Sequence, residues 1–124
     1  GVPVLMIHST TPPDMTPDFR KACAKAGLRM IAVHKPGSGG ASGRDSREGP
    51  EAIAPDYAAI LDAEGISACT IAGHCSGGLY ALQFAQSFPD RCDKVVLIDT
   101  GLPFSGRREL MALPPDHRLL VRRC

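Results

Sequence analysis

The sequence lacks three features that would assign it to a membrane or secreted class. No apolar run is long enough to cross a bilayer, and the chain begins inside an apolar stretch without a basic leader or cleavage site. Its five cysteines are an odd number and include no C-x-x-C pair, which argues against a disulfide framework. We therefore expect a reduced protein with a cytoplasmic location.

The sequence also lacks a strong charge of either sign. The net charge is +1 at pH 7, and the basic residues are scattered until Arg118, Arg122 and Arg123 near the end. This distribution gives no reason to expect a nucleic-acid or membrane partner, so the expected partner is a small-molecule substrate or ligand. No metal or cofactor is expected.

Apolar segments instead predict an α/β fold. The 124 residues contain 44% hydrophobic residues, which is enough for the core of one domain. Strands alternate with helices, and this order favours parallel pairing through right-handed crossovers. The predicted strands cover residues 2–8, 28–33, 67–72 and 94–99, and the predicted helices cover 17–26, about 56–64 and 77–87. We expect a parallel sheet of about four strands with helices on both faces.

The stretch Gly73-His74-Cys75-Ser76-Gly77-Gly78 lies between a predicted strand and a predicted helix. A sharp turn at this point forces its central residue into strained dihedral angles and tolerates only small flanking residues. Placing Cys75 at the apex makes Gly73 and Gly77 the flanks. The pattern therefore predicts a nucleophile elbow with a cysteine in the position of the nucleophile.

Three alternatives remain open for this turn. In a shifted register Ser76 is the apex, although His74 is then a bulky flank. The turn can also be a phosphate site, but it has neither a Lys-Ser/Thr pair nor G-x-G-x-x-G spacing. In the third alternative Cys75 is an inert, buried residue that fills the turn.

Several segments together resemble the α/β-hydrolase superfamily, from residue 3 to about residue 104. The segments are the turn itself, Pro3–His8 before it, Val95–Asp99 after it and Lys35–Gly40 in the loop after the second strand. They resemble most the haloperoxidase, esterase and C–C hydrolase kind of domain, and dienelactone-hydrolase-like members also carry cysteine at the apex. The resemblance implies a partial α/β-hydrolase fold, in which the second strand and the elbow strand flank the first.

The resemblance also divides the chain. Residues 1–104 are expected to be the N-terminal and central part of a hydrolase domain, and residues 105–124 the start of a lid, with His117 in a helix. A complete fold of this family needs roughly twice this length. A chain cut in this way leaves a sheet edge uncovered, so we expect self-association or marginal stability.

Acyl transfer requires a nucleophile, donors to the oxyanion, a base and an acid that orients the base. The donors are expected at the backbone N–H of Ser76 and at Ser9 or Thr10, next to His8. In this family the order along the chain is nucleophile, acid and histidine, which Asp99 and His117 satisfy. The resemblance, however, places the acid and the base further along the chain. Asp99 is then a turn residue and His117 a solvated one.

Two functions follow. The first is a hydrolase of small esters, lactones or related acyl compounds whose base lies outside these residues. The second is a ligand-sensing domain that does not turn over its ligand, because domains of this kind are also found fused to transcription regulators.

Overall fold

The computed structural model describes residues 1–8, 16–37, 41, 43, 49–100 and 120–121. The elements in chain order are β1 (Val2–Ile7), α1 (Pro17–Lys25), β2 (Leu28–Val33), α2 (Pro50–Ala63), β3 (Cys69–His74), α3 (Gly77–Ser87), the 3-10 helix η1 (Pro89–Arg91), β4 (Cys92–Ile98) and β5 (Leu120–Val121). The strands form one sheet in the order β2-β1-β3-β4-β5.

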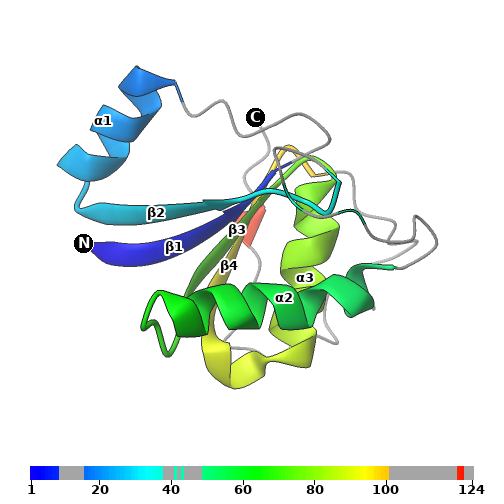
Figure 1. The fold of residues 1–124 in the computed structure, drawn as a ribbon. Coiled ribbons are helices and arrows are strands. Elements are labelled where there is room, and N and C mark those ends of the chain that lie inside the picture. Colours follow the sequence, from blue (N-terminus) through cyan, green and yellow to red (C-terminus); the bar gives the residue numbers. More distant parts are fainter. Residues whose placement is uncertain (9–15, 38–40, 42, 44–48, 101–119, 122–124) are drawn as a thin grey trace.

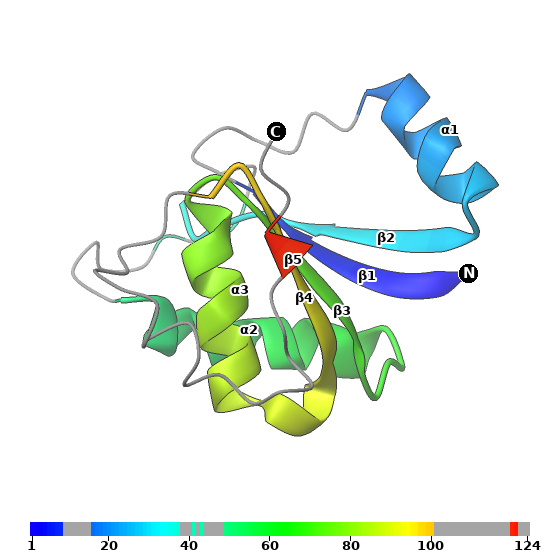
Figure 2. The same ribbon diagram turned by 180° about the vertical axis from the view of Figure 1, so that it is seen from behind.

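Every strand pair in this sheet is parallel. The order confirms the predicted α/β fold, with β2 and β3 on opposite sides of β1. Helices α2 and α3 cover one face, while α1 lies on the other face against β2 (Figure 1). Seen from behind, β5 lies at the edge of the sheet beside β4 (Figure 2).

The fifth strand was not predicted. Leu120 was expected to continue a helix, but Leu120 and Val121 pair with Val96 and Leu97 of β4. A strand of two residues has too little alternation for a sequence pattern to reveal it, so its identity depends on the partner strand. The rest of the expected lid, residues 105–119 with His117, lies outside the described residues.

Helix α2 begins earlier than the sequence indicated. The helix was expected to be well formed from about Asp56, with an earlier start left open; it starts at Pro50, and Pro55 lies inside it. Proline suits the first helical position because its missing N–H has no intrahelical partner there. Pro50 takes that position, and the helix continues through Pro55. The predicted start of α1 is correct, because the Thr16 side chain accepts a hydrogen bond from the Phe19 N–H at 3.3 Å.

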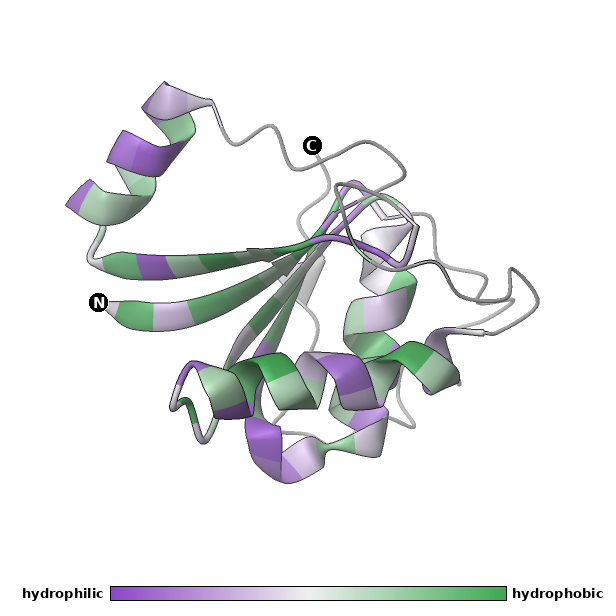
Figure 3. Ribbon diagram, in the orientation of Figure 1, coloured by the Kyte–Doolittle hydropathy of each residue, from purple (hydrophilic) through white to green (hydrophobic). Residues whose placement is uncertain are grey.

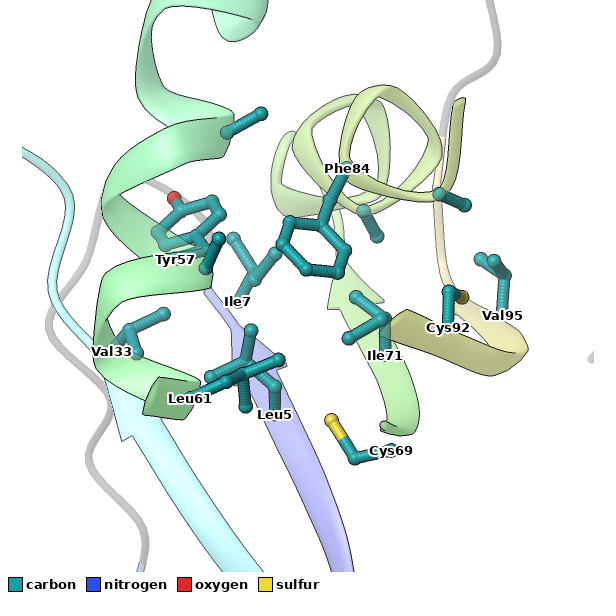
Figure 4. Packing of buried hydrophobic residues seen from close by; sticks show 14 of the residues in the cluster. Leu5, Ile7, Val33, Tyr57, Leu61, Cys69, Ile71, Phe84, Cys92 and Val95 are labelled. Atoms are coloured by element: carbon teal, nitrogen blue, oxygen red, sulfur yellow. The ribbon is translucent and has the colours of Figure 1, made fainter. Parts of the chain in front are cut away.

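The main core lies between the sheet and helices α2 and α3. Leu5 and Ile7 of β1 and Ile71 of β3 are fully buried there against Tyr57 and Phe84 (Figure 4). Coloured by hydropathy, β1 is apolar along most of its length, as expected for a strand covered on both faces (Figure 3). None of the helices in the described part of the chain is long and apolar enough to span a membrane.

Candidate functional site

The candidate site lies where the central strands of the sheet end. In parallel sheets a crevice forms at the carboxyl ends of strands whose connections leave in opposite directions. Here β1 connects outward to β2, and β3 lies on the other side of β1. The β3–α3 turn therefore stands at the expected position of a ligand site (Figures 1 and 2).

The turn places Cys75 at its apex. Cys75 has a φ of 52°, in the left-handed region that residues other than glycine rarely adopt. Ser76 has a φ of −63° and is the N-cap of α3, so its backbone is already helical. The side chain of Cys75 is exposed, whereas Cys23, Cys69 and Cys92 are buried. Backbone strain of this kind clusters at functional turns, and Asp99 after β4 is a second exposed residue with a positive φ.

Three glycines make this turn possible by close packing. A Cβ atom on Gly73 would lie 2.5 Å from the Cα of Gly78, and a Cβ atom on Gly77 would collide with the carbonyl oxygen of Ile7. A Cβ atom on Gly78 would collide with the side chain of Thr100. Strand, turn and helix are thus in backbone contact, and a side chain at any of the three positions would force them apart.

Hydrogen bonds to β4 hold the turn in place. The Cys75 N–H donates to the carbonyl oxygen of Ile98 at 2.9 Å, and the Gly78 N–H donates to the Cys75 carbonyl at 3.1 Å. The Thr100 hydroxyl lies 3.4 Å from the Gly73 carbonyl oxygen and 3.3 Å from that of Ile98. The turn is therefore anchored to the end of β4, by Ile98 and Thr100, which lie far from Cys75 in the sequence.

Lys35 is a residue of the site that the sequence analysis missed. It follows β2, and its Nζ donates a hydrogen bond to the Ser76 Oγ at 2.9 Å. The same Nζ lies 4.6 Å from the centre of the Tyr80 ring. Partial burial lowers the pKa of Lys35, while the nearby Cys75 acts in the opposite direction. Lys35 had been noted only as part of a loop motif, because no local pattern indicates that this loop reaches the turn.

Histidines stand at the ends of three neighbouring strands. His8 follows β1, His34 follows β2 and His74 ends β3. Burial lowers the pKa of His8, and the neighbouring His74 and His34 lower it further. The Nε2 of His8 is buried without a hydrogen-bond partner among the described residues. Burial of this kind favours a neutral imidazole.

The remaining predicted site residues are only partly placed. Asp99 follows β4, is exposed and has a φ of 48°. The hydroxyl of the next residue, Thr100, donates the hydrogen bonds to the carbonyl oxygens of Gly73 and Ile98. Ser9, Thr10 and His117 lie outside the described residues.

The buried cysteines differ chemically from Cys75. Burial raises the pKa of the Cys92 thiol to about 11, with a further contribution from Cys69, and burial also raises the pKa of Cys69. A thiol reacts as its thiolate, so both groups are unreactive while the fold is intact. Cys75 is thus the cysteine best placed for chemistry among the described residues.

A cavity of about 320 Å³ lies close to this site but does not open onto the turn. It is lined by His34, Pro36, Ala41, Gly43, Ile53, Asp56, Tyr57 and Ile60. Neither Lys35 nor Cys75 lines it, although Lys35 lies between two of its residues in the sequence. The exposed turn, rather than this cavity, carries the reactive groups.

The arrangement fits attack on an acyl carbon. An exposed sulfur stands at the N-terminus of α3, where the first N–H groups lack intrahelical partners and the helix dipole favours negative charge. The backbone N–H of Ser76 is in the position that donates to the oxyanion in turns of this kind. The Lys35 ammonium group donates a hydrogen bond to the side chain of Ser76. Among the described residues no group of three or more His, Cys, Asp or Glu side chains is arranged to hold a metal ion.

Comparisons with known proteins agree with this geometry. Residues 3–122 match the family model of the alpha/beta hydrolase fold. The 2-hydroxy-6-oxononadienedioate/2-hydroxy-6-oxononatrienedioate hydrolase of Burkholderia vietnamiensis is 34% identical over 110 residues, which are 79% of this chain and 38% of that protein. The chain therefore spans less than two fifths of this relative.

Solved structures of similar fold are also longer than this chain. A CIB-like hydrolase from Thermoplasma acidophilum superposes with a TM-score of 0.77 at 17% identity, covering 95% of this chain and 59% of that one. A thermophilic esterase from Thermogutta terrifontis gives a TM-score of 0.74 at 25% identity, covering 90% and 41%.

Proposed function

This chain belongs to the α/β-hydrolase fold family, and from this premise we propose that it is the N-terminal and central part of a hydrolase of small esters, lactones or related acyl compounds. Cys75 is the proposed nucleophile. The observation that supports this role is the left-handed φ of Cys75, an exposed residue. The glycines on either side of it are required because a Cβ atom there would clash with neighbouring atoms. The names of its relatives, a hydrolase and an esterase, agree with a hydrolytic reaction.

The proposed reaction has two steps. The Cys75 sulfur attacks the carbonyl carbon, a C–S bond forms, and the electron pair of the C=O bond moves to the oxygen as an oxyanion. The oxyanion collapses, the C–O bond to the alcohol breaks, and the departing alkoxide takes a proton from water, which balances the proton that the Cys75 thiol releases to solvent. Water then hydrolyses the thioester, releasing the carboxylic acid and restoring the thiol.

The oxyanion is stabilised by backbone donors in this proposal. The Ser76 N–H at the start of α3 is the first donor, and one from Ser9 or Thr10 is the second. Removing one such donor in hydrolases typically costs about a hundredfold to a thousandfold in rate. A preformed turn supplies this stabilisation without reorganisation, which is why the strain at Cys75 is useful.

The base is assigned to sequence outside these 124 residues. His117 is the only histidine after Cys75, and the resemblance to the family places the acid and the base further along the chain than Asp99 and His117. General base catalysis is typically worth about a hundredfold or more. The proposal therefore predicts that this chain alone is acylated once and does not turn over.

The test is a burst experiment with p-nitrophenyl acetate. We expect at most one equivalent of p-nitrophenol, with an acetyl group on Cys75 in the peptide map. Cys75→Ala abolishes the burst, while Ser76→Ala and the thiol control Cys23→Ala retain it.

Three outcomes would contradict this proposal. Steady turnover lost equally in Cys75→Ala and His117→Ala would place the whole triad within these residues. A burst lost in Ser76→Ala but not in Cys75→Ala would make the serine the nucleophile. The absence of any acyl adduct would favour the ligand-sensing alternative.

A further inference from the structure

A single cation lies beside the turn in the described part of the site. Lys35 reaches it from the end of β2, which is separated from β3 by β1. Its Nζ is held by the hydroxyl of Ser76, the residue next to the apex, at 2.9 Å. The proposed reaction does not use this group, because backbone N–H groups stabilise the oxyanion.

We propose that Lys35 is a positioning residue for Cys75: its ammonium group, hydrogen-bonded to Ser76, places a fixed positive charge at the residue next to the attacking sulfur. This inference rests on the proposed function and names a residue that prepares the same nucleophile. Lys35 takes no proton from Cys75 in this role and forms no bond to the substrate. It acts as a fixed positive charge.

The physical reason is that the nucleophile is the thiolate rather than the thiol. Cysteines become reactive at helix N-termini and beside lysine, arginine or protonated histidine. Cys75 precedes α3, and Lys35 is hydrogen-bonded to Ser76, the residue that follows Cys75. An opposite charge within a few ångströms favours the charged form of an acid, which here is the sulfur anion.

The ammonium group is confined on two sides. The Ser76 hydroxyl accepts its hydrogen bond, and the ring of Tyr80 lies 4.6 Å away, within the range of a cation–π contact. Burial lowers the pKa of Lys35, and the Cys75 thiolate partly offsets this effect.

Other titratable groups lie at this edge of the sheet, and a test must distinguish their effect on the alkylation rate from that of Lys35. They are His8 after β1, His34 after β2, His74 at the end of β3, Asp99 after β4 and Tyr80 in α3. Imidazoles ordinarily titrate near 6.5, and the pKa of His8 is lowered. The alkylation rates are therefore measured at pH 7.5 and above.

The experiment measures the rate of iodoacetamide alkylation at Cys75 between pH 7.5 and 10.5, site by site in peptide maps. In Lys35→Met we expect the rate at pH 7.5 to fall about threefold to tenfold and the profile to move to higher pH. Lys35→Arg restores the wild-type profile because it keeps the charge. Ser76→Ala has an intermediate effect, since the ammonium group loses its anchor.

Two controls separate this charge effect from a structural one. Lys21→Met removes the same formal charge from an exposed position on α1 and leaves the profile unchanged. Protection of Cys69 and Cys92 in the same maps shows that each variant is folded. High salt moves the wild-type profile toward that of Lys35→Met, because a partly exposed pair is screened.

Identical profiles for the wild type and a folded Lys35→Met variant would overturn the inference. An equal shift in Lys21→Met would do the same, because it would indicate a general charge effect. Neither result depends on the acylation burst. A shifted profile without a burst would refute the proposed function alone, and a burst with an unshifted profile would refute the role of Lys35 alone.

Discussion

The two faces of the sheet are packed very differently in the described part of the chain. Toward α2 and α3 the buried cluster joins four strands and both helices and contains large residues such as Phe84 and Tyr57. On the face of α1 the buried cluster consists of Val4, Met6 and Ala72. Helix α1 itself has one buried residue, Cys23.

The strand β1 shows that this difference does not come from the strand itself. Its residues alternate between the faces, with Leu5 toward α2 and α3 and its neighbours Val4 and Met6 toward the other side. All three are buried and apolar. Among the described residues, the cluster around Leu5 includes side chains of α2 and α3, whereas the buried cluster of Val4 and Met6 includes none from a helix.

The comparison teaches where the rigidity of the candidate site originates. Helix α3 begins at the turn and belongs to the well-packed layer, with Phe84 and Ala81 fully buried. A strained φ persists only where surrounding structure enforces it. The strained backbone of Cys75 is therefore stabilised by the well-packed layer of α2 and α3.

The largest expected effect is the loss of a side chain from the well-packed face. Phe84 is fully buried between α3 and the sheet, so Phe84→Ala leaves a cavity that close-packed neighbours fill poorly. We expect the free energy of unfolding to fall by about 3–5 kcal/mol in urea denaturation. Phe84→Leu is the control for lost volume, with a smaller expected loss. A loss below about 1 kcal/mol for Phe84→Ala would mean that this layer is not the main source of stability.

A matched pair on β1 sharpens the comparison directly. Leu5→Ala and Met6→Ala remove neighbouring side chains from opposite faces of the same strand. Costs of such truncations range over about 2–5 kcal/mol and depend on how well the site can collapse. We expect Leu5→Ala near the upper end and Met6→Ala near about 2 kcal/mol, compared in the same urea titrations. Equal costs would show that both faces are packed alike.

The smallest expected effect is a difference in local opening. Cys23 on α1 and Cys69 on β3 are both buried, but only Cys69 belongs to the large cluster. In a Cys75→Ala background we expect Cys23 to be alkylated about tenfold faster than Cys69 in the native state. This ratio corresponds to about 1.4 kcal/mol of lower opening free energy. Equal labelling rates, measured by peptide mapping over time, would indicate that α1 opens only with the rest of the fold.

Much of the fold could be predicted from local pattern. The continuous apolar runs identified the four longer strands, and Thr16 followed by Pro17 identified the start of α1. The boundaries were less accurate at α2, because Pro50 and Pro55 both suit the first turn of a helix. The strand β5 escaped prediction because two residues carry no periodicity.

The part of the candidate site that one short segment forms could be predicted from the sequence. The part that distant segments bring together could not. The glycines around Cys75 are contiguous in the sequence, and their spacing indicated which residue stands at the apex. Lys35 lies far from Cys75 in the sequence and was not recognised as a member of the site. The position of its ammonium group depends on the β2-β1-β3 strand order and on the direction of the loop after β2.

The sequence by itself therefore determined the α/β class, the main strands and the sharp turn at Cys75, because periodicity and the small size of glycine act over a few residues. Only the tertiary structure decided which charge stands beside the sulfur and which face of the sheet is well packed. Both depend on contacts between segments far apart in the chain. Such contacts follow from how the elements pack together, and no local spacing encodes them.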